Sequence, residues 1–124
     1  MKDIPKISAS EWEVMKLIWK SSPLTSEEII NSLSQKTDWS AQTIKTFITR
    51  LIKKEAIGFN KIGRNYHYYP LVSEDECLKV ENKSFLERLY GGAVSVLFTK
   101  FLEEESLSEK EIEELETLLK SKKK

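Results

Sequence analysis

One stretch of the sequence, residues 41–54, combines side chains suited to contact a large polar partner. Its apolar residues recur at i, i+3, i+4, i+7 and i+8, which predicts a helix with one buried stripe. That stripe consists of Ile44, Phe47, Ile48, Leu51 and Ile52. At about 100° per residue, the opposite side of such a helix presents amide, hydroxyl and cationic groups. No acidic residue lies between Ser40 and Lys54, although a neutral helix surface usually alternates acidic and basic residues.

The polar side of this predicted helix suits the major groove of a DNA duplex. Amide and hydroxyl groups can meet base edges there, and cations can meet phosphates. The candidate base-reading residues are Gln42, Thr43, Lys45, Thr46, Thr49 and Arg50. The candidate contacts to the DNA backbone are Lys53, Lys54, Lys61 and Arg64. The alternative is an ordinary solvated helix surface, on which lysines only keep the helix in solution.

The elements around this helix predict a winged helix-turn-helix. Two helices are expected before it, over residues 11–20 and 26–34, and two strands after it, over 57–62 and 65–69. Four Ser/Thr-x-x-Glu boxes mark expected helix starts, because the hydroxyl and the carboxylate satisfy amide donors of the first turn. The boxes are Ser10–Glu13, Thr25–Glu28, Ser73–Glu76 and Ser108–Glu111. In such a fold the third helix enters the groove and the hairpin lies along the DNA backbone.

The distribution of charge divides the chain into two parts. The 124 residues are 40% hydrophobic and 32% charged, and the net charge is zero, which is the range of a globular protein. Residues 1–72 hold 11 Lys and Arg against 7 Asp and Glu, whereas residues 73–124 hold 9 against 13. This asymmetry favours a polyanion-binding surface confined to the N-terminal part. We therefore predict a DNA-binding domain over 1–72 and a helical domain over 73–124.

Several function classes conflict with what the sequence lacks. No apolar run approaches the ~18–20 residues that cross a bilayer, and the N-terminus has no signal-peptide core, so we expect a cytoplasmic protein without membrane insertion. One cysteine and one histidine cannot build a closed zinc site, and we predict no cofactor and no metal. Cys77 is interpreted as a small apolar residue rather than a redox thiol, and His67 as a packed side chain rather than a ligand. With no phosphate-binding glycine loop and no catalytic triad spacing, we do not expect an enzyme.

The C-terminal domain is expected to need a second copy of the chain. Its helices are predicted over 74–90, 93–103 and 109–120, and a domain of this size is marginal as a free-standing core. Pairing of two copies would cover the apolar faces, and its two-fold symmetry would match a two-fold DNA site. The candidate dimerisation residues are Leu86, Leu89, Leu97, Phe98, Phe101, Leu102, Ile112, Leu115 and Leu119. The alternative is a helical extension that folds back on the winged helix in a monomer. The predicted fold class is mostly α, with a small β-hairpin wing.

The motifs that carry a family resemblance are Ile7-Ser8-x-x-Glu11-Trp12-Glu13-Val14-Met15, Trp39-Ser40-x-x-Thr43-Ile44-x-Thr46, Thr49-Arg50-Leu51-x-Lys53-Lys54, Tyr68-Tyr69, Phe85-Leu86, Tyr90-Gly91-Gly92 and Leu107-Ser108-x-x-Glu111-Ile112-x-Glu114-Leu115. They extend along almost the whole chain and resemble the penicillinase-repressor and methicillin-resistance-repressor family (BlaI/MecI/CopY). The resemblance implies a homodimeric repressor with an N-terminal winged helix and a C-terminal dimerisation domain. It also implies a palindromic operator with TACA/TGTA-type half-sites and, as candidate targets, β-lactam-resistance genes.

The resemblance also bears on how the protein would be switched. Relatives controlled by β-lactams are cleaved at an Asn-Phe bond, and an ungapped match places the corresponding bond between Lys100 and Phe101. A membrane sensor-protease pathway is therefore a candidate partner and Lys100–Phe101 a candidate inactivating cleavage site, although the lysine argues against the same induction. The copper-responsive branch carries a C-terminal Cys-x-Cys motif that this chain lacks, which argues against copper sensing.

Taken together, the residues and the resemblance predict a sequence-specific repressor whose partners are double-stranded operator DNA and a second copy of the chain. Steric repression is the expected mechanism, with the dimer on an operator that overlaps a promoter. The alternative function is a winged-helix scaffold that binds protein without DNA specificity. Such a scaffold would expose apolar residues on the helix over 41–54, where the sequence has polar ones.

Overall fold

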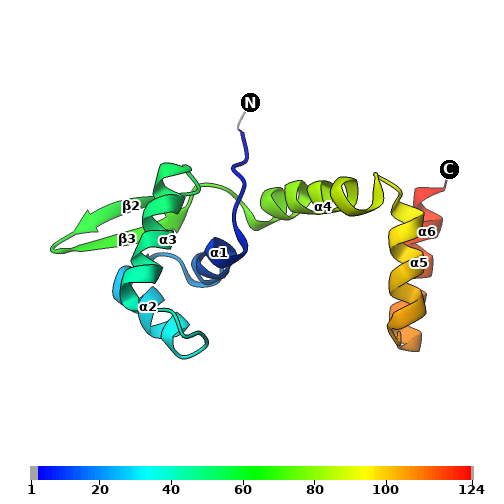
Figure 1. The fold of residues 1–124 in the computed structure, drawn as a ribbon, viewed down its shortest axis with the longest axis horizontal. Coiled ribbons are helices and arrows are strands. Elements are labelled where there is room, and N and C mark those ends of the chain that lie inside the picture. Colours follow the sequence, from blue (N-terminus) through cyan, green and yellow to red (C-terminus); the bar gives the residue numbers. More distant parts are fainter. Residues whose placement is uncertain (1–2, 124) are drawn as a thin grey trace. The chain divides into compact units, whose positions relative to one another are not determined.

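The computed structural model describes residues 3–123. The chain forms two compact units, which divide between Asn82 and Lys83. The helices and strands are α1 (Ala9–Ser21), β1 (Leu24–Thr25), α2 (Ser26–Ser34), α3 (Ala41–Lys53), β2 (Ile57–Ile62), β3 (Asn65–Pro70), α4 (Glu74–Tyr90), α5 (Val94–Glu104) and α6 (Glu109–Lys122). All of them except β1 are labelled in Figure 1. The predicted fold class, mostly helical with a small hairpin wing, is confirmed.

The first unit has a closed apolar core. Helices α1, α2 and α3 each contribute one buried stripe, and the start of β2 and the segment after β3 complete it. The core residues are Ile7, Val14, Met15, Ile18, Ile29, Leu33, Ile44, Phe47, Ile48, Leu51, Ala56, Ile57, Val72 and Cys77. Because the apolar stripe of α3 belongs to this core, the orientation of that helix is fixed by packing.

The sheet has three antiparallel strands in the order β1-β3-β2. The β2–β3 hairpin pairs Ile57 with Pro70 and Ile62 with Asn65, as the predicted hairpin required. Strand β1 was not predicted, because its two residues leave no periodic pattern to detect; Leu24 pairs with Tyr68. Figure 1 shows the hairpin extending beside α3, which is the arrangement of a wing next to a recognition helix.

Helix α1 begins earlier than the sequence predicted. Its capping box joins Ser8 and Glu11: the Glu11 amide donates to Ser8 Oγ at 3.1 Å, and the Ser8 amide donates to Glu11 Oε1 at 3.1 Å. The predicted box at Ser10–Glu13 is therefore wrong, since the buried Glu11 carboxylate forms the cap instead. The other three predicted boxes form as expected.

Helix α3 ends in a Schellman motif. The Glu55 amide donates to the Ile52 carbonyl and the Ala56 amide to the Leu51 carbonyl, both at 3.0 Å. Glu55 has a φ of 63°, in the left-handed region that usually favours glycine. The motif turns the chain sharply from the recognition helix into the wing.

The second unit differs from the first in burial. No residue from 83 to 123 is fully buried, whereas Leu97, Leu107 and Leu115 are half-buried. An apolar hollow of about 410 Å³ lies between α5 and α6, lined by Phe98, Leu102, Leu107, Ile112, Leu115 and Leu119 among others. Among residues 3–123, no helix combines the length and apolar character that a membrane span requires.

The boundary between the units lies ten residues beyond the predicted one, which followed residue 72. The reason is that Val72 and Cys77 are 3% exposed and belong to the core of the first unit, so the first turns of α4 belong to that unit as well. With this boundary, residues 1–82 hold 12 Lys and Arg against 11 Asp and Glu. The predicted difference in net charge between the domains therefore almost disappears. What remains is a basic surface on α3 and the wing.

Candidate nucleic-acid interface

Helix α3 is anchored at its first residues by a cap and an aromatic pair. The Thr43 amide donates to Ser40 Oγ at 3.1 Å, which satisfies a donor that the helix itself leaves unpaired. The Trp39 ring meets the Phe47 ring edge-on with centroids 5.1 Å apart. The loop before α3 is thereby tied to the buried side of the helix, and the opposite side is left for contact with a partner.

The predicted base-reading residues lie together on that opposite side. Gln42, Lys45, Thr49 and Arg50 are exposed. Thr43 and Thr46 are half-buried, and they flank the exposed set. No acidic side chain occurs on α3, so a polyanion can approach this side without like-charge repulsion.

Two threonine hydroxyls on this side already donate hydrogen bonds within the helix. Thr46 Oγ1 donates to the Gln42 carbonyl and Thr49 Oγ1 to the Lys45 carbonyl, each at 3.0 Å. Their oxygens keep lone pairs for donors such as adenine N6 or cytosine N4, and their methyl groups can contact a thymine methyl. These residues can therefore read a base as acceptors or by apolar contact, and the hydrogen bonds hold each rotamer.

All four predicted DNA-backbone residues are exposed cations. Lys53 lies at the end of α3, Lys61 on β2, and Arg64 in the hairpin turn. None of the ion pairs within residues 3–123 involves these three. The Lys61 ammonium lies 5.8 Å from the centroid of the Tyr66 ring, a distance at which a cation and an aromatic face attract each other.

Lys54 differs from the other three, because its ammonium has partners within the protein. It forms an ion pair with Glu11 Oε1 and donates to the Lys6 carbonyl at 2.8 Å. The Glu11 side chain is 2% exposed, so Lys54 balances the only buried carboxylate within residues 3–123. This cation joins the end of α3 to the start of α1, and its side chain remains 34% exposed.

The pKa of Glu11 reports the same interaction. Burial raises this pKa. The hydrogen bonds from Lys54 and Ser8 and the charge of Lys54 together lower it by more, so the pKa lies below its ordinary value. The carboxylate is thus ionised in the folded protein, as the ion pair requires.

The wing carries an aromatic surface that the sequence reasoning missed. The Phe59 ring meets the Tyr66 ring edge-on at 5.1 Å and the Tyr68 ring at 6.3 Å between centroids. With Ile52 these rings line a hollow of about 190 Å³ beside the end of α3. The available signal was the two-residue period of the hairpin, which places Phe59 opposite Tyr68 and Lys61 opposite Tyr66.

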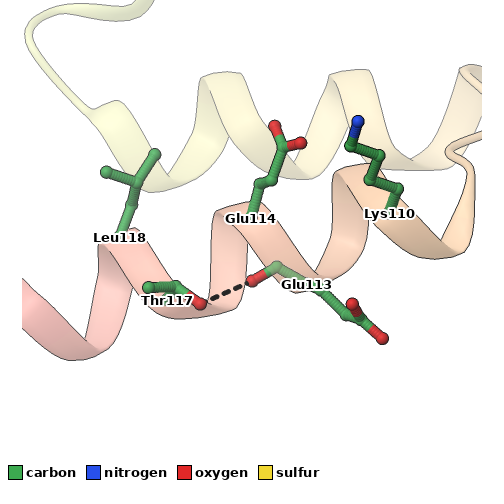
Figure 2. Close-up of a pocket in the computed structure, with 5 residues that line it drawn as sticks. All are labelled: Lys110, Glu113, Glu114, Thr117 and Leu118. Atoms are coloured by element: carbon green, nitrogen blue, oxygen red, sulfur yellow. Dashed lines mark hydrogen bonds between the residues drawn. The ribbon is translucent and has the colours of Figure 1, made fainter.

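Most of the predicted dimerisation residues are exposed in the single chain. Leu86, Leu97 and Leu115 are half-buried. The exposed members are Leu89, Phe98, Phe101, Leu102, Ile112 and Leu119. A second hollow, on α6, is lined by more charged and polar residues: Figure 2 shows Lys110, Glu113, Glu114, Thr117 and Leu118 around it, with the Thr117 hydroxyl donating to the Glu113 carbonyl.

The remaining predicted residues are distributed over both units. Lys100 and Phe101 are both exposed on α5. His67 is half-buried on β3, and Cys77 is buried on α4. No group of three or more His, Cys, Asp or Glu side chains within residues 3–123 is arranged to hold a metal ion.

Comparison with known proteins identifies the family. Residues 7–121 match the family model described as penicillinase repressor. The chain is 44% identical to the penicillinase repressor of Bacillus licheniformis over 123 residues, which are 99% of this chain and 96% of that protein. It is 40% identical to the methicillin resistance regulatory protein MecI of Staphylococcus aureus over 117 residues, 94% of this chain and 95% of that one.

Two solved structures match this chain at 47% identity, each over 61% of this chain and 93% of that chain. One is the solution structure of the DNA-binding domain of the repressor BlaI, with a TM-score of 0.56. The other is the Bacillus licheniformis BlaI monomeric form in complex with the blaP half-operator, with a TM-score of 0.54. From the matched family model and these relatives, the chain belongs to the penicillinase repressor family of DNA-binding transcriptional repressors, which are not enzymes.

Proposed function

We propose that this repressor acts as a homodimer on a palindromic operator with TACA/TGTA-type half-sites and blocks transcription by excluding polymerase from an overlapping promoter. The observation that carries the proposal is the acid-free side of α3, which is exposed while the opposite side is held in the core. The related BlaI was solved as a monomer on a half-operator, which supports one winged unit for each half-site.

Within each half-site, α3 lies in the major groove. Gln42, Lys45 and Arg50 reach base edges as donors, since an amide, an ammonium and a guanidinium all carry N–H groups. Thr43, Thr46 and Thr49 add acceptors and methyl contacts. Lys53, Lys61 and Arg64 contact phosphates. We leave Lys54 out of the backbone-contact set, because Glu11 and the Lys6 carbonyl already hold its ammonium.

The homodimer is proposed from the exposure of the second unit. Phe98, Phe101 and Leu102 are 48%, 52% and 55% exposed, and the hollow between α5 and α6 is lined mainly by apolar side chains. Leaving such surface in water costs about 25 cal/mol per Å². A second copy with the same two-fold related face can cover it, so the second unit would carry dimerisation and the first unit DNA binding.

The regulated genes and the switch are proposed from the relatives. Their names concern penicillinase and methicillin resistance, which supports β-lactam-resistance genes as targets. A membrane sensor-protease pathway acting in the cytoplasm would inactivate the dimer at Lys100–Phe101. Both residues are exposed on α5, although the lysine requires a protease that accepts a cation before the cut bond.

The test compares the affinity of the full chain for palindromic and scrambled duplexes at several salt concentrations. Thr46→Ala is expected to reduce the preference for the palindrome more than it reduces affinity for scrambled DNA. Lys53→Ala is expected to weaken both duplexes alike and to lower the salt slope by about one unit. Lys110→Ala on α6, outside the proposed DNA-binding surface, serves as the matched control and should leave the slope unchanged. Equal affinity for both duplexes in the unmodified chain would contradict the proposal and favour a protein-binding scaffold.

A further inference from the structure

One face of the wing carries a row of aromatic rings that ends at a lysine. In the register of the hairpin, Phe59 pairs with Tyr68 and Lys61 pairs with Tyr66. Directly paired residues, and residues two apart on a strand, share one face of a sheet, so all four side chains lie on the same face. Ile52 of α3 lines the hollow beside these rings. The row therefore extends from the end of the recognition helix to Lys61.

The Tyr66 ring is held from within this row. It meets the Phe59 ring edge-on with centroids 5.1 Å apart, and Phe59 in turn meets Tyr68 at 6.3 Å. Contact with a neighbouring ring limits the rotation of Tyr66 and orients its face. The Lys61 ammonium lies 5.8 Å from the centroid of that ring, within the reach of a cation–π contact.

Lys61 and Lys54 are held in different ways. The Lys54 ammonium pairs with the Glu11 carboxylate, whose negative charge opposes that of the lysine. Within residues 3–123, the Lys61 ammonium has no ion pair, and the ring is its partner. An aromatic ring carries no net charge, so it restrains the ammonium and leaves the positive charge and its N–H donors for an anion.

We propose that Tyr66 is a positioning residue of the DNA-binding surface, whose ring holds the Lys61 ammonium ready for a phosphate. The inference rests on the proposed phosphate contact of Lys61 and concerns the first unit alone. A lysine side chain loses rotamer freedom when it binds a phosphate, and this loss opposes binding. A ring that already restrains the ammonium in the free protein lowers that cost.

The experiment measures binding of the full chain to a duplex with a single half-site, chosen from sequences that the chain selects from a random library. Tyr66→Phe keeps the ring and removes the hydroxyl, whereas Tyr66→Leu keeps an apolar side chain and removes the ring. Each change is also combined with Lys61→Ala. Arg64→Ala provides the matched background, because Arg64 is an exposed cation of the same wing and the cation–π contact of Tyr66 is with Lys61.

Tyr66→Leu is expected to lose about threefold in affinity, and Tyr66→Phe to stay within about 1.5-fold of the unmodified chain. Lys61→Ala is expected to lose more and to lower the salt slope by about one unit. In the Lys61→Ala background, Tyr66→Leu should cost nothing further, because the cation that it positions is gone. In the Arg64→Ala background, Tyr66→Leu should cost the same about threefold.

Two results would overturn the inference and leave the proposed function standing. One is a loss from Tyr66→Leu that is absent, or that persists undiminished in the Lys61→Ala background, since a persistent loss belongs to the shape of the wing. The other is an equal loss in Tyr66→Phe and Tyr66→Leu, which would assign the effect to the hydroxyl. If Lys61→Ala binds and responds to salt like the unmodified chain, the phosphate contact itself is contradicted and this inference is lost with it.

A second measurement on the free protein covers the case in which Tyr66→Leu does not fold. The ring current of Tyr66 should move the Lys61 Hε proton resonances upfield of those of Lys53, whose side chain is exposed at the end of α3. Lys61→Ala assigns these signals, and Tyr66→Phe should retain the shift. Lys61 and Lys53 signals at the same position in the unmodified chain would overturn the inference.

Discussion

The two units of the chain contain similar apolar side chains, but these are buried in the first unit and largely exposed in the second. In the first unit, Ile18, Ile44 and Leu51 are completely buried, since three helices and a sheet converge on one core. In the second unit, Phe98 and Leu102 remain about half exposed, since α5 and α6 can cover only one stripe of each other. The difference lies in the number of faces that meet, because both units have the apolar residues a core needs. One unit is complete by itself, and the other presents a surface.

The largest expected effect comes from placing a charge on the exposed apolar surface of the second unit. Phe98→Asp should abolish dimerisation and lower operator affinity by about 10²–10⁴-fold, because two linked half-site contacts become independent. The single chain should fold as before, since Phe98 is half exposed in it. Sedimentation of the full chain and binding to full and single half-site duplexes measure both effects.

Leu118→Asp is the matched control for that change. Leu118 is 62% exposed, yet it borders the second hollow, on α6, among Lys110 and two glutamates (Figure 2). It should leave the dimer intact, since the proposed contact lies on the apolar side of α5 and α6. A dimer that survives Phe98→Asp but not Leu118→Asp would place the contact on the other side.

A pair of leucine substitutions sharpens the comparison between the units. Leu51→Ala should cost about 2–5 kcal/mol of the free energy of unfolding, because it opens a cavity in the closed core. That cost should not depend on protein concentration. Leu115→Ala in the second unit should destabilise by an amount that depends on concentration, since a second copy completes its packing. Urea unfolding at two widely different concentrations separates the cases, and concentration dependence in both variants would refute the distinction.

Loss of the buried carboxylate is expected to have a smaller effect with a pH signature. Glu11→Gln should cost about 1–3 kcal/mol at neutral pH, because it leaves the Lys54 ammonium without its counter-charge. The folded protein holds the Glu11 proton less tightly than the unfolded chain, since its pKa is lowered. The contribution of the carboxylate is therefore present above the unfolded pKa and is lost as pH falls through the folded pKa. Thermal unfolding from pH 7 to pH 3 should show a shallower acid decline in Glu11→Gln, whereas parallel curves would exclude this origin.

Most elements of the first unit were predicted correctly from the sequence, but one strand was missed and one helix start was misplaced. Helix α2, the hairpin and the polar side of α3 could be predicted because periodicity and capping boxes are local signals. Strand β1 was missed because its two residues acquire their pairing only from Tyr68 and His67 on β3. The start of α1 was misplaced because two boxes overlap, at Ser8 and Ser10, and only burial of Glu11 distinguishes them.

Predictions of the site were limited by tertiary contacts. Lys53 and Lys54 look equivalent in sequence, yet only Lys54 reaches a carboxylate 43 residues away. The boundary after residue 72 was expected from a change in composition. However, Cys77 is buried in the core of the first unit, so the first turns of α4 belong to that unit. Charge patterns identify a face of a helix, and only the folded chain shows which cations on it are already neutralised.

The smallest predicted effect concerns the turn that joins the recognition helix to the wing. Glu55 holds a φ of 63°, which costs an ordinary side chain about 1–2 kcal/mol relative to the right-handed region. Glu55→Gly should therefore raise the free energy of unfolding by about 1 kcal/mol, with part of the relief offset by the greater freedom of glycine in the unfolded chain. Glu55→Ala removes the same charge and keeps the Cβ, so it should bring no such gain. Gly63 offers the reverse change, because its φ is 64° and no atom beyond its two chain neighbours lies within 4 Å of an added Cβ. Gly63→Ala should then destabilise by a similar amount for backbone reasons alone. Urea unfolding of the three variants tests this, and a gain shared by Glu55→Ala would assign the effect to charge instead of conformation.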